Sequence, residues 1–257
     1  MARNSAVNTA VQEQFGAAAP AYATSTVHAS GPDLPALVAA AALTGRERVL
    51  DLGTGAGHTA IALAPHAASV AAVDLTPAML AVAAGLAAGR GLTNVTFHEA
   101  DASALPFPDA SFDVMACRYA AHHFAEPALA LREAARVLVP GGRFVLVDCV
   151  APEDPALDTF LQVFEFLRDA SHVRDCRASE WLRLFAGAGF EAEVLGRSVI
   201  SLDGADWVQR MNTPAEKVAM IRRLFAEATP SQRAAFELRE EPWGFSQASA
   251  LLRARRR

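Results

Sequence analysis

The sequence predicts an α/β protein whose mostly parallel sheet is covered by helices on both faces. From Arg48 to Val150, short apolar runs alternate with helical stretches. The short runs are apolar throughout, which is typical of strands buried on both faces of a parallel sheet. Because a helix follows most of these strands, the alternation predicts a doubly wound sheet rather than a meander of hairpins.

The first segment of the chain is predicted to be helical. Residues 1–45 contain helical pieces that prolines interrupt, and they end in the apolar helix LPALVAAAAL with Gly45 as its stop. This segment precedes the first strand. We therefore expect residues 1–45 to form an N-terminal helical lid.

The next hundred residues supply five strands and three helices. The predicted strands are RVLDLG, SVAAVDL, VTFHEAD, FDVMACR and RFVLVDCV. The helical segments between them are HTAIALAPHA, PAMLAVAAGLAAGRG and ALALREAARVLVPGG. The apolar runs fit strand lengths and the longer segments fit helices, so each assignment follows from length and composition.

The regular alternation of short apolar runs with helical stretches ends in the last hundred residues. A long amphipathic stretch, ALDTFLQVFEFLRDA, precedes the polar loop SHVRDCRA and another helix. EAEVLGRSVISL and FSQASALLRAR are predicted strands, with helices between them. We expect one domain over residues 46–257, with helical insertions at about 153–188 and 205–240.

Composition narrows the class of protein. The chain has 257 residues and a formal net charge of −5, which argues against a broad phosphate-binding surface and so against a nucleic-acid partner. Its three cysteines are widely spaced and form no CxxC pair, so neither a disulfide framework nor a zinc cluster is indicated. No apolar run is long enough to span a bilayer. We expect a cytoplasmic protein without membrane insertion, and a homodimer is left open.

The most informative motif is VLDLGTGAGHTA, at residues 49–60. It combines an apolar strand, the acid Asp51, three alternating glycines and the start of a helix. Glycines permit a tight turn and close backbone approach to a ligand at the carboxyl end of a strand. The dinucleotide fingerprint GxGxxG would need a small residue where this chain has His58.

This motif resembles the first motif, (D/E)xGxGxG, of class I S-adenosylmethionine-dependent methyltransferases. VAAVDLTPAML places Asp74 at the end of the second strand, and EADASALPFPDASFDVMACRYAAHHF places Asp101 after the third. VLVPGGRFVLVD matches the turn before the fifth strand. The motifs cover roughly residues 11–195 and most resemble the ubiquinone/menaquinone-biosynthesis (type 11) methyltransferases. The resemblance implies a Rossmann-like, seven-stranded sheet with strand order 3-2-1-4-5-7-6, strand 7 antiparallel, and helical cap elements.

The same resemblance implies S-adenosyl-L-methionine as cofactor and S-adenosyl-L-homocysteine as product. A carboxylate at Asp74 suits the ribose, because it can accept hydrogen bonds from both hydroxyls. Asp101 with Ala102 would face the adenine, Asp51 would lie near the methionine end, and the Arg118 carbonyl would meet the amino group. The expected binding residues are Asp51, Gly53, Thr54, Gly55, Gly57, Asp74, Leu75, Asp101, Ala102 and Arg118.

A sulfonium is a good methyl donor, so alignment and exclusion of water supply much of the catalysis and a base is optional. Two histidines, His122 and His123, follow the fourth strand, and one of them could act as a base or could support the loop. On the polar loop, His172 could deprotonate an acceptor and Arg174 could hold a carboxylate or enolate. We take His123, His172 and Arg174 as the catalytic candidates, and no metal site is expected because the histidines lack ligand spacing.

Aromatic residues raise a further hypothesis about the walls of the site. Phe15 and Tyr22 resemble the aromatic pair that folds over the cofactor in this family, while His28 is assigned a structural role. Phe160, Phe164, Phe166 and Leu167 either face an apolar substrate cavity or form the core. A covered, apolar cavity would suit an aromatic, quinone-like or polyketide-like small molecule.

Two other functions stay open on the sequence alone. One is a nicotinamide-dependent oxidoreductase on a similar sheet, against which Asp51 and His58 argue. The other is an S-adenosylmethionine-binding protein that uses the cofactor for chemistry other than methyl transfer. Methyl transfer needs no unique catalytic residue. The sequence therefore cannot distinguish a methyltransferase from such a binding protein by the lack of one.

Overall fold

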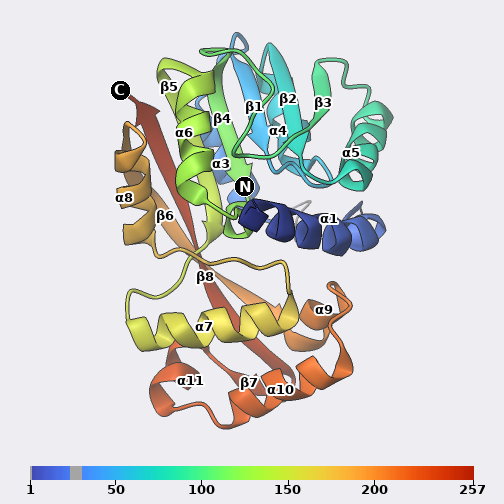
Figure 1. Cartoon of the computed structure of the whole chain (residues 1–257), viewed down its shortest axis with the longest axis vertical. Coiled ribbons are helices and arrows are strands. Elements are labelled where there is room, and N and C mark those ends of the chain that lie inside the picture. Colours follow the sequence, from blue (N-terminus) through green and yellow to red (C-terminus); the bar gives the residue numbers. More distant parts are fainter. Residues whose placement is uncertain (1, 24–30) are drawn as a thin grey trace.

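One sheet organises the upper part of the molecule in the computed structural model (Figure 1). The structure describes residues 2–23 and 31–257, and the side chains of residues 6–19 and 31–257. The strand order is β3-β2-β1-β4-β5-β8-β6, and the two-residue β7 pairs with β8. The predicted order 3-2-1-4-5-7-6 is confirmed, because β8 is the strand predicted as the last.

Five strands form parallel pairs, and of the two remaining long strands only β8 runs in the opposite direction, between β5 and β6. The parallel strands are β1 (Arg48–Leu52), β2 (Ser69–Asp74), β3 (Val95–Glu99), β4 (Phe112–Arg118) and β5 (Leu138–Cys149). β8 (Trp243–Arg256) is antiparallel to β5 and to β6 (Phe190–Asp203), and β7 spans Arg239–Glu240. Consequently the carboxyl ends of the five parallel strands lie at one edge of the sheet.

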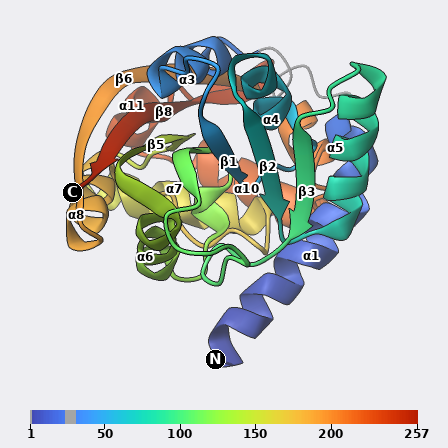
Figure 2. The same ribbon diagram turned by 90° about the horizontal axis from the view of Figure 1, so that it is seen from above.

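Helices cover both faces of this sheet (Figure 2). On one face, α3 and α4 bury Leu37 and Leu63 against Val49 and Val145. On the other face, α6 and α8 pack with Trp181 in the same cluster as the sheet. Helix α5 lies beside β2 and β3 on the face of α4, where its Ala83 closely approaches Gly57 at the start of α4. These elements span α3 (Asp33–Ala41), α4 (His58–Leu63), η1 (Ala64–His66), α5 (Pro77–Gly89), η2 (Ala121–His123), α6 (Pro127–Val137) and α8 (Ala178–Gly187).

A separate apolar cluster forms the lower part of the molecule in Figure 1, where β6 and β8 continue past the five parallel strands. It is built on α7 (Pro155–Arg168), α9 (Gly204–Gln209), α10 (Ala215–Ala226) and α11 (Pro230–Phe236). Phe160 and Phe164 are buried in this cluster, whereas Phe166 is 55% exposed. The aromatic stripe of α7 is therefore core on one side, and neither Phe160 nor Phe164 lines the cavity described below.

The first helix, α1 (Ala2–Ala23), crosses between the two parts of the molecule (Figure 1). Its Gln12 amide donates to the carbonyl of Leu75, which follows β2, and its Gln14 amide donates to the carbonyl of Met211, which follows α9. The side chain of Tyr22 and the whole of His28 lie outside the described residues. In the described ranges, no helix combines the length and apolar character needed to cross a membrane.

The packing of α7 gives a matched pair of stability tests. Phe164 is fully buried against Trp207, Phe225, Phe236 and Phe245, so Phe164→Ala should cost about 3–5 kcal/mol through lost transfer free energy and a cavity. Phe166→Ala, on the exposed side of the same helix, should change the free energy of unfolding by less than about 0.5 kcal/mol. Urea unfolding of both variants checks this, and equal effects would contradict the assigned core.

Candidate functional site

The glycine-rich turn joins β1 to α4 at the carboxyl edge of the sheet. Gly53 has φ +69°, and a Cβ added there would lie 2.5 Å from the Cβ of Ala120, just beyond β4. Gly55 has φ +53°, and its Cβ position faces open space. The left-handed conformation therefore favours glycine at both positions, and at Gly53 the close approach of two loops also leaves no room for a side chain.

Asp74, the last residue of β2, fixes this turn. Its carboxylate accepts one hydrogen bond from the amide of Gly55 and another from the amide of Thr76, both at 2.8 Å. Burial raises the pKa of Asp74, while these two amides oppose the rise. The carboxylate thus has a set orientation at the cavity wall.

Asp101, after β3, is held in a similar way. One carboxylate oxygen accepts from the amide and from the hydroxyl of Ser103, each at 2.8 Å. The other accepts from the side-chain amide of Asn8 on α1. The helix that crosses the cavity therefore contacts the position predicted to face adenine.

Asp51 lies behind the turn and is almost wholly buried. One of its oxygens accepts from the Thr54 hydroxyl at 2.6 Å, and the other accepts no hydrogen bond from any described residue. Burial raises its pKa to about 6, against the opposing effect of the Thr54 hydrogen bond. A buried carboxylate oxygen without a donor fits a positively charged or hydrogen-bond-donating group of a ligand beside it.

A continuous cavity extends from this turn to the lower part of the molecule. Eight of the ten predicted cofactor residues line it: Gly53, Thr54, Gly55, Asp74, Leu75, Asp101, Ala102 and Arg118. Asp51 and Gly57 stand behind the lining. The side chain of Arg118 pairs with Asp33 of α3 and lies over the Tyr119 ring, so it braces the end of β4.

Three histidines meet in the other half of the cavity. The ring of His122 lies 4.3 Å from that of His123 and 5.8 Å from that of His172, measured between centroids. Phe15 of α1 packs edge-on against His123. The structure thus brings two predicted catalytic candidates, His123 and His172, into one cluster with His122.

The environments of the three rings differ. Burial and the neighbouring His122 lower the pKa of His123 to about 4, and burial with both other histidines lowers that of His172 to about 2. Burial alone would lower the pKa of His122 as well, but the charge and hydrogen bond of Asp148 raise it to about 9. His123 and His172 are therefore neutral, weak bases near pH 7, and His122 is the charged ring.

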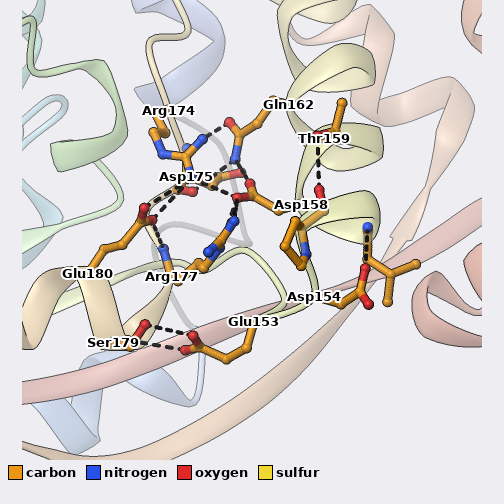
Figure 3. Close-up of polar contacts among 12 residues, drawn as sticks. Glu153, Asp154, Asp158, Thr159, Gln162, Arg174, Asp175, Arg177, Ser179 and Glu180 are labelled. Carbon is orange, nitrogen blue, oxygen red and sulfur yellow. Dashed lines mark hydrogen bonds and ion pairs between the residues drawn. The ribbon is translucent and has the colours of Figure 1, made fainter.

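Arg174 does not join this cluster, contrary to the expectation that it would hold a substrate anion. Its guanidinium binds Asp158 at 2.7 Å and Glu180 at 3.1 Å, and Arg177 binds the same oxygen of Asp158 at 2.6 Å (Figure 3). It is absent from the lining of the cavity. Arg174 instead ties the loop that carries His172 to α7 and α8.

Several residues that line the cavity or stand directly behind its wall were not anticipated from the sequence. Asp148, the penultimate residue of β5, binds His122, and its place near the end of an apolar strand was the signal that could have found it. The others are single polar residues within apolar helices or strands or in the polar loop: Glu165, Arg168, Asp169, Asp175 and Gln247. Within the described part of the chain, no group of three or more His, Cys, Asp and Glu side chains is arranged to hold a metal ion.

Comparisons with known proteins agree with this geometry. Residues 50–146 match the family model described as a methyltransferase domain. The chain is 41% identical over 222 residues to the uncharacterized methyltransferase YcgJ of Bacillus subtilis, covering 86% of this chain and 88% of that protein. The chain belongs to the type 11 class I S-adenosylmethionine-dependent methyltransferases.

Two further similarities involve a solved structure and a partial match. The crystal structure of YcgJ from Bacillus subtilis superimposes with a TM-score of 0.84 at 38% identity, covering 87% of this chain and 97% of that one. The demethylmenaquinone methyltransferase of Thermus thermophilus is 43% identical over 120 residues, which cover 46% of this chain and 54% of that protein. Membership of this family sets the nicotinamide-dependent alternative aside.

The ion cluster around Asp158 gives a prediction about stability and pH. Asp158→Ala should cost about 1–3 kcal/mol in free energy of unfolding at pH 7, because two arginines lose their shared partner. Burial acts to raise the pKa of Asp158, but Gln162, Arg174 and Arg177 outweigh it and lower the pKa. The contribution is therefore present above the unfolded pKa of about 4 and is lost as the pH falls through the folded value.

Denaturant unfolding of wild type and Asp158→Ala at pH 7 and pH 3 checks this. The difference in free energy of unfolding between the two proteins should be smaller at pH 3. Glu227→Ala is the control, since it breaks an exposed pair with Arg223 and should cost less than about 0.5 kcal/mol. If this difference is the same at both pH values, the ionised carboxylate of Asp158 does not have the stabilising role assigned to it.

Proposed function

We propose that this methyltransferase binds S-adenosyl-L-methionine along the glycine-rich turn and transfers the methyl group to a small aromatic or quinone-like molecule. The observation that carries the proposal is the continuity of the cavity. Its one half is lined by the turn, Asp74 and Asp101, and its other half by the histidine cluster. A donor and an acceptor can therefore meet inside one cavity.

The residues of the first half fit the cofactor. Asp74 presents a fixed carboxylate for two ribose hydroxyls, and Asp101 with Ala102 would bind the adenine edge. Asp51 offers a buried oxygen that no described residue occupies, suited to the cationic methionine end, directly or through water. Thr54, Leu75 and the backbone of Arg118 complete the set, and Gly53, Gly55 and Gly57 shape the turn.

The bound sulfonium supplies an activated methyl group, so the protein must mainly orient the acceptor and exclude water. Helix α1 is suited to exclusion because it contacts both halves of the cavity, through Asn8 at Asp101 and through Phe15 at His123. We assign residues 1–45 the role of a lid on this basis, over a catalytic domain that spans residues 46–257. His123 and His172, with their lowered pKa values, are better suited to shaping the acceptor site as neutral hydrogen-bonding groups than to removing protons.

The acceptor half combines apolar walls with a polar end. Ile200, Leu202, Trp207 and Phe15 provide surfaces for a flat ring, and the histidine cluster provides polar contacts. The similarity to a demethylmenaquinone methyltransferase supports a quinone-like ring. An aromatic body with at least one polar substituent is therefore the acceptor that fits best.

Removal of the ribose contact tests the cofactor site. Asp74→Ala should weaken binding of S-adenosylhomocysteine roughly tenfold or more, because a charged hydrogen-bond acceptor is lost. Isothermal titration calorimetry measures this directly. Asp109→Ala, at an exposed position outside the cavity, is the control and should leave the affinity unchanged. Failure of the wild-type protein to bind S-adenosylmethionine or its product, or binding of NADH in their place, would overturn the proposal.

A further inference from the structure

Helix α1 brings a polar side chain to the part of the cavity that contains Asp101. Four residues at helical spacing share one face of this helix: Asn8, Val11, Gln12 and Phe15. All of them except Gln12 line the cavity. Asn8 is the polar residue among these three, and its side-chain amide donates a hydrogen bond to Oδ2 of Asp101. A residue of the first helix therefore lies in the proposed cofactor half of the cavity.

Other contacts hold α1 in this place besides the one made by Asn8. The Gln12 amide donates to the carbonyl of Leu75, and the Gln14 amide donates to the carbonyl of Met211. The helix also packs against α5. The position of Asn8 is therefore set by the helix as a whole, and its own hydrogen bond is not the only attachment.

The contact with Asp101 determines which way the Asn8 amide points. An ionised carboxylate only accepts hydrogen bonds, so Asn8 must turn its NH2 group toward Asp101 and its oxygen, Oδ1, away from it. This Oδ1 makes no hydrogen bond with a described residue. The side chain lines the cavity and is half-buried. Asn8 thus offers an acceptor that the protein itself leaves unused in the described ranges.

Two hydrogen-bond acceptors lie side by side as a result. One carboxylate oxygen of Asp101 is engaged by the amide and the hydroxyl of Ser103. The other, Oδ2, accepts from Asn8 and has a lone pair left for a second donor. Because Oδ1 of Asn8 belongs to the same planar amide that donates to Oδ2, one hydrogen bond and one amide group separate the two acceptors. A ligand group that satisfies both must carry two N–H bonds.

The adenine base has one donor group, its exocyclic amino group, and this group carries two N–H bonds. We propose that Asn8 is a further specificity-determining residue of the cofactor site. Asp101 accepts one N–H of the adenine amino group, and Oδ1 of Asn8 accepts the other. This inference rests on the proposed function, in which Asp101 binds the adenine edge, and it adds a residue of α1 to that site.

The arrangement makes the contact between α1 and the cavity sensitive to the base of the bound nucleoside. An amino group gives each acceptor a donor and leaves the hydrogen bond between Asn8 and Asp101 in place. A base with an oxo group at this position would put an oxygen against two acceptors and leave both without a donor, which is costly in a buried site. Helix α1 therefore contributes to recognition of the cofactor as well as to exclusion of water.

A cycle of two ligands and two proteins tests the inference. The ligands are S-adenosylhomocysteine and its deamino analogue, in which a hydrogen replaces the amino group of the base. Removal of the amino group should weaken binding to the wild type roughly five- to tenfold more than binding to Asn8→Ala, because only the wild type loses the hydrogen bond to Oδ1. Isothermal titration calorimetry with the full-length chain measures the four affinities.

Gln12→Ala is the matched control on the same helix. It removes an attachment of α1 but no residue that lines the cavity, so it should weaken binding of both ligands by the same factor. Asn8 belongs to none of the three buried apolar clusters, and alanine is a good helix former. Asn8→Ala should therefore fold as the wild type does, which an unchanged thermal midpoint checks.

Each outcome of the cycle decides between recognition and attachment. If removal of the amino group costs the same factor in wild type and in Asn8→Ala, Asn8 only attaches the helix, as Gln12 does, and the inference is wrong. If in addition S-adenosylhomocysteine binds the wild type, the proposed function still stands. If neither ligand binds the wild type, the inference and the proposed function both fail.

Discussion

The parallel pairing of β1 with β2 and β4, and of β4 with β5, is the constraint on which the site depends. In this register Asp51 lies beside Ala72 and Ala116, so the strands end at about the same level. Every loop that follows a strand therefore enters the same crevice. The turn at Gly53 can then touch Ala120, and Asp74 can hold the amide of Gly55, although these residues are far apart in the sequence.

The acceptor half of the cavity is organised around Asp148, a carboxyl group buried in the sheet. Asp148 near the end of β5 can remain in the interior because three N–H donors surround it, two of them from His122. The His172 loop reaches the same place because Val173 and Arg174 donate their backbone amides to the carbonyl of His122. Ion pairs of Arg174 and Arg177 with Asp158 then fix this loop to α7.

The sequence predicted the sheet, and it predicted most of the residues that line the cavity at the glycine-rich turn, because the signals for both are local. A strand followed by a glycine or an acid can be recognised in a few residues, as with Gly53, Asp74 and Asp101. The acceptor half could not be read in this way, because Glu165, Asp175 and Gln247 meet only when α7, a loop and β8 converge. Arg174 illustrates the limit: a polar loop was expected correctly, but whether its arginine faces the cavity or a buried Asp158 depends on the packing of α7.

Helix α1 links the two halves energetically as well as spatially. It holds the turn after β2 through Gln12 and the segment after α9 through Gln14, and the same helix places Asn8 on Asp101 and Phe15 on His123. In the proposed enzyme, an adenine amino group would donate to the side of Asp101 that Asn8 contacts, because a carboxylate oxygen can accept more than one hydrogen bond. Any shift of the helix on cofactor binding would reach Phe15 and His123. Because these contacts lie on one rigid element, occupancy of the first half can alter the walls of the second without any separate coupling device.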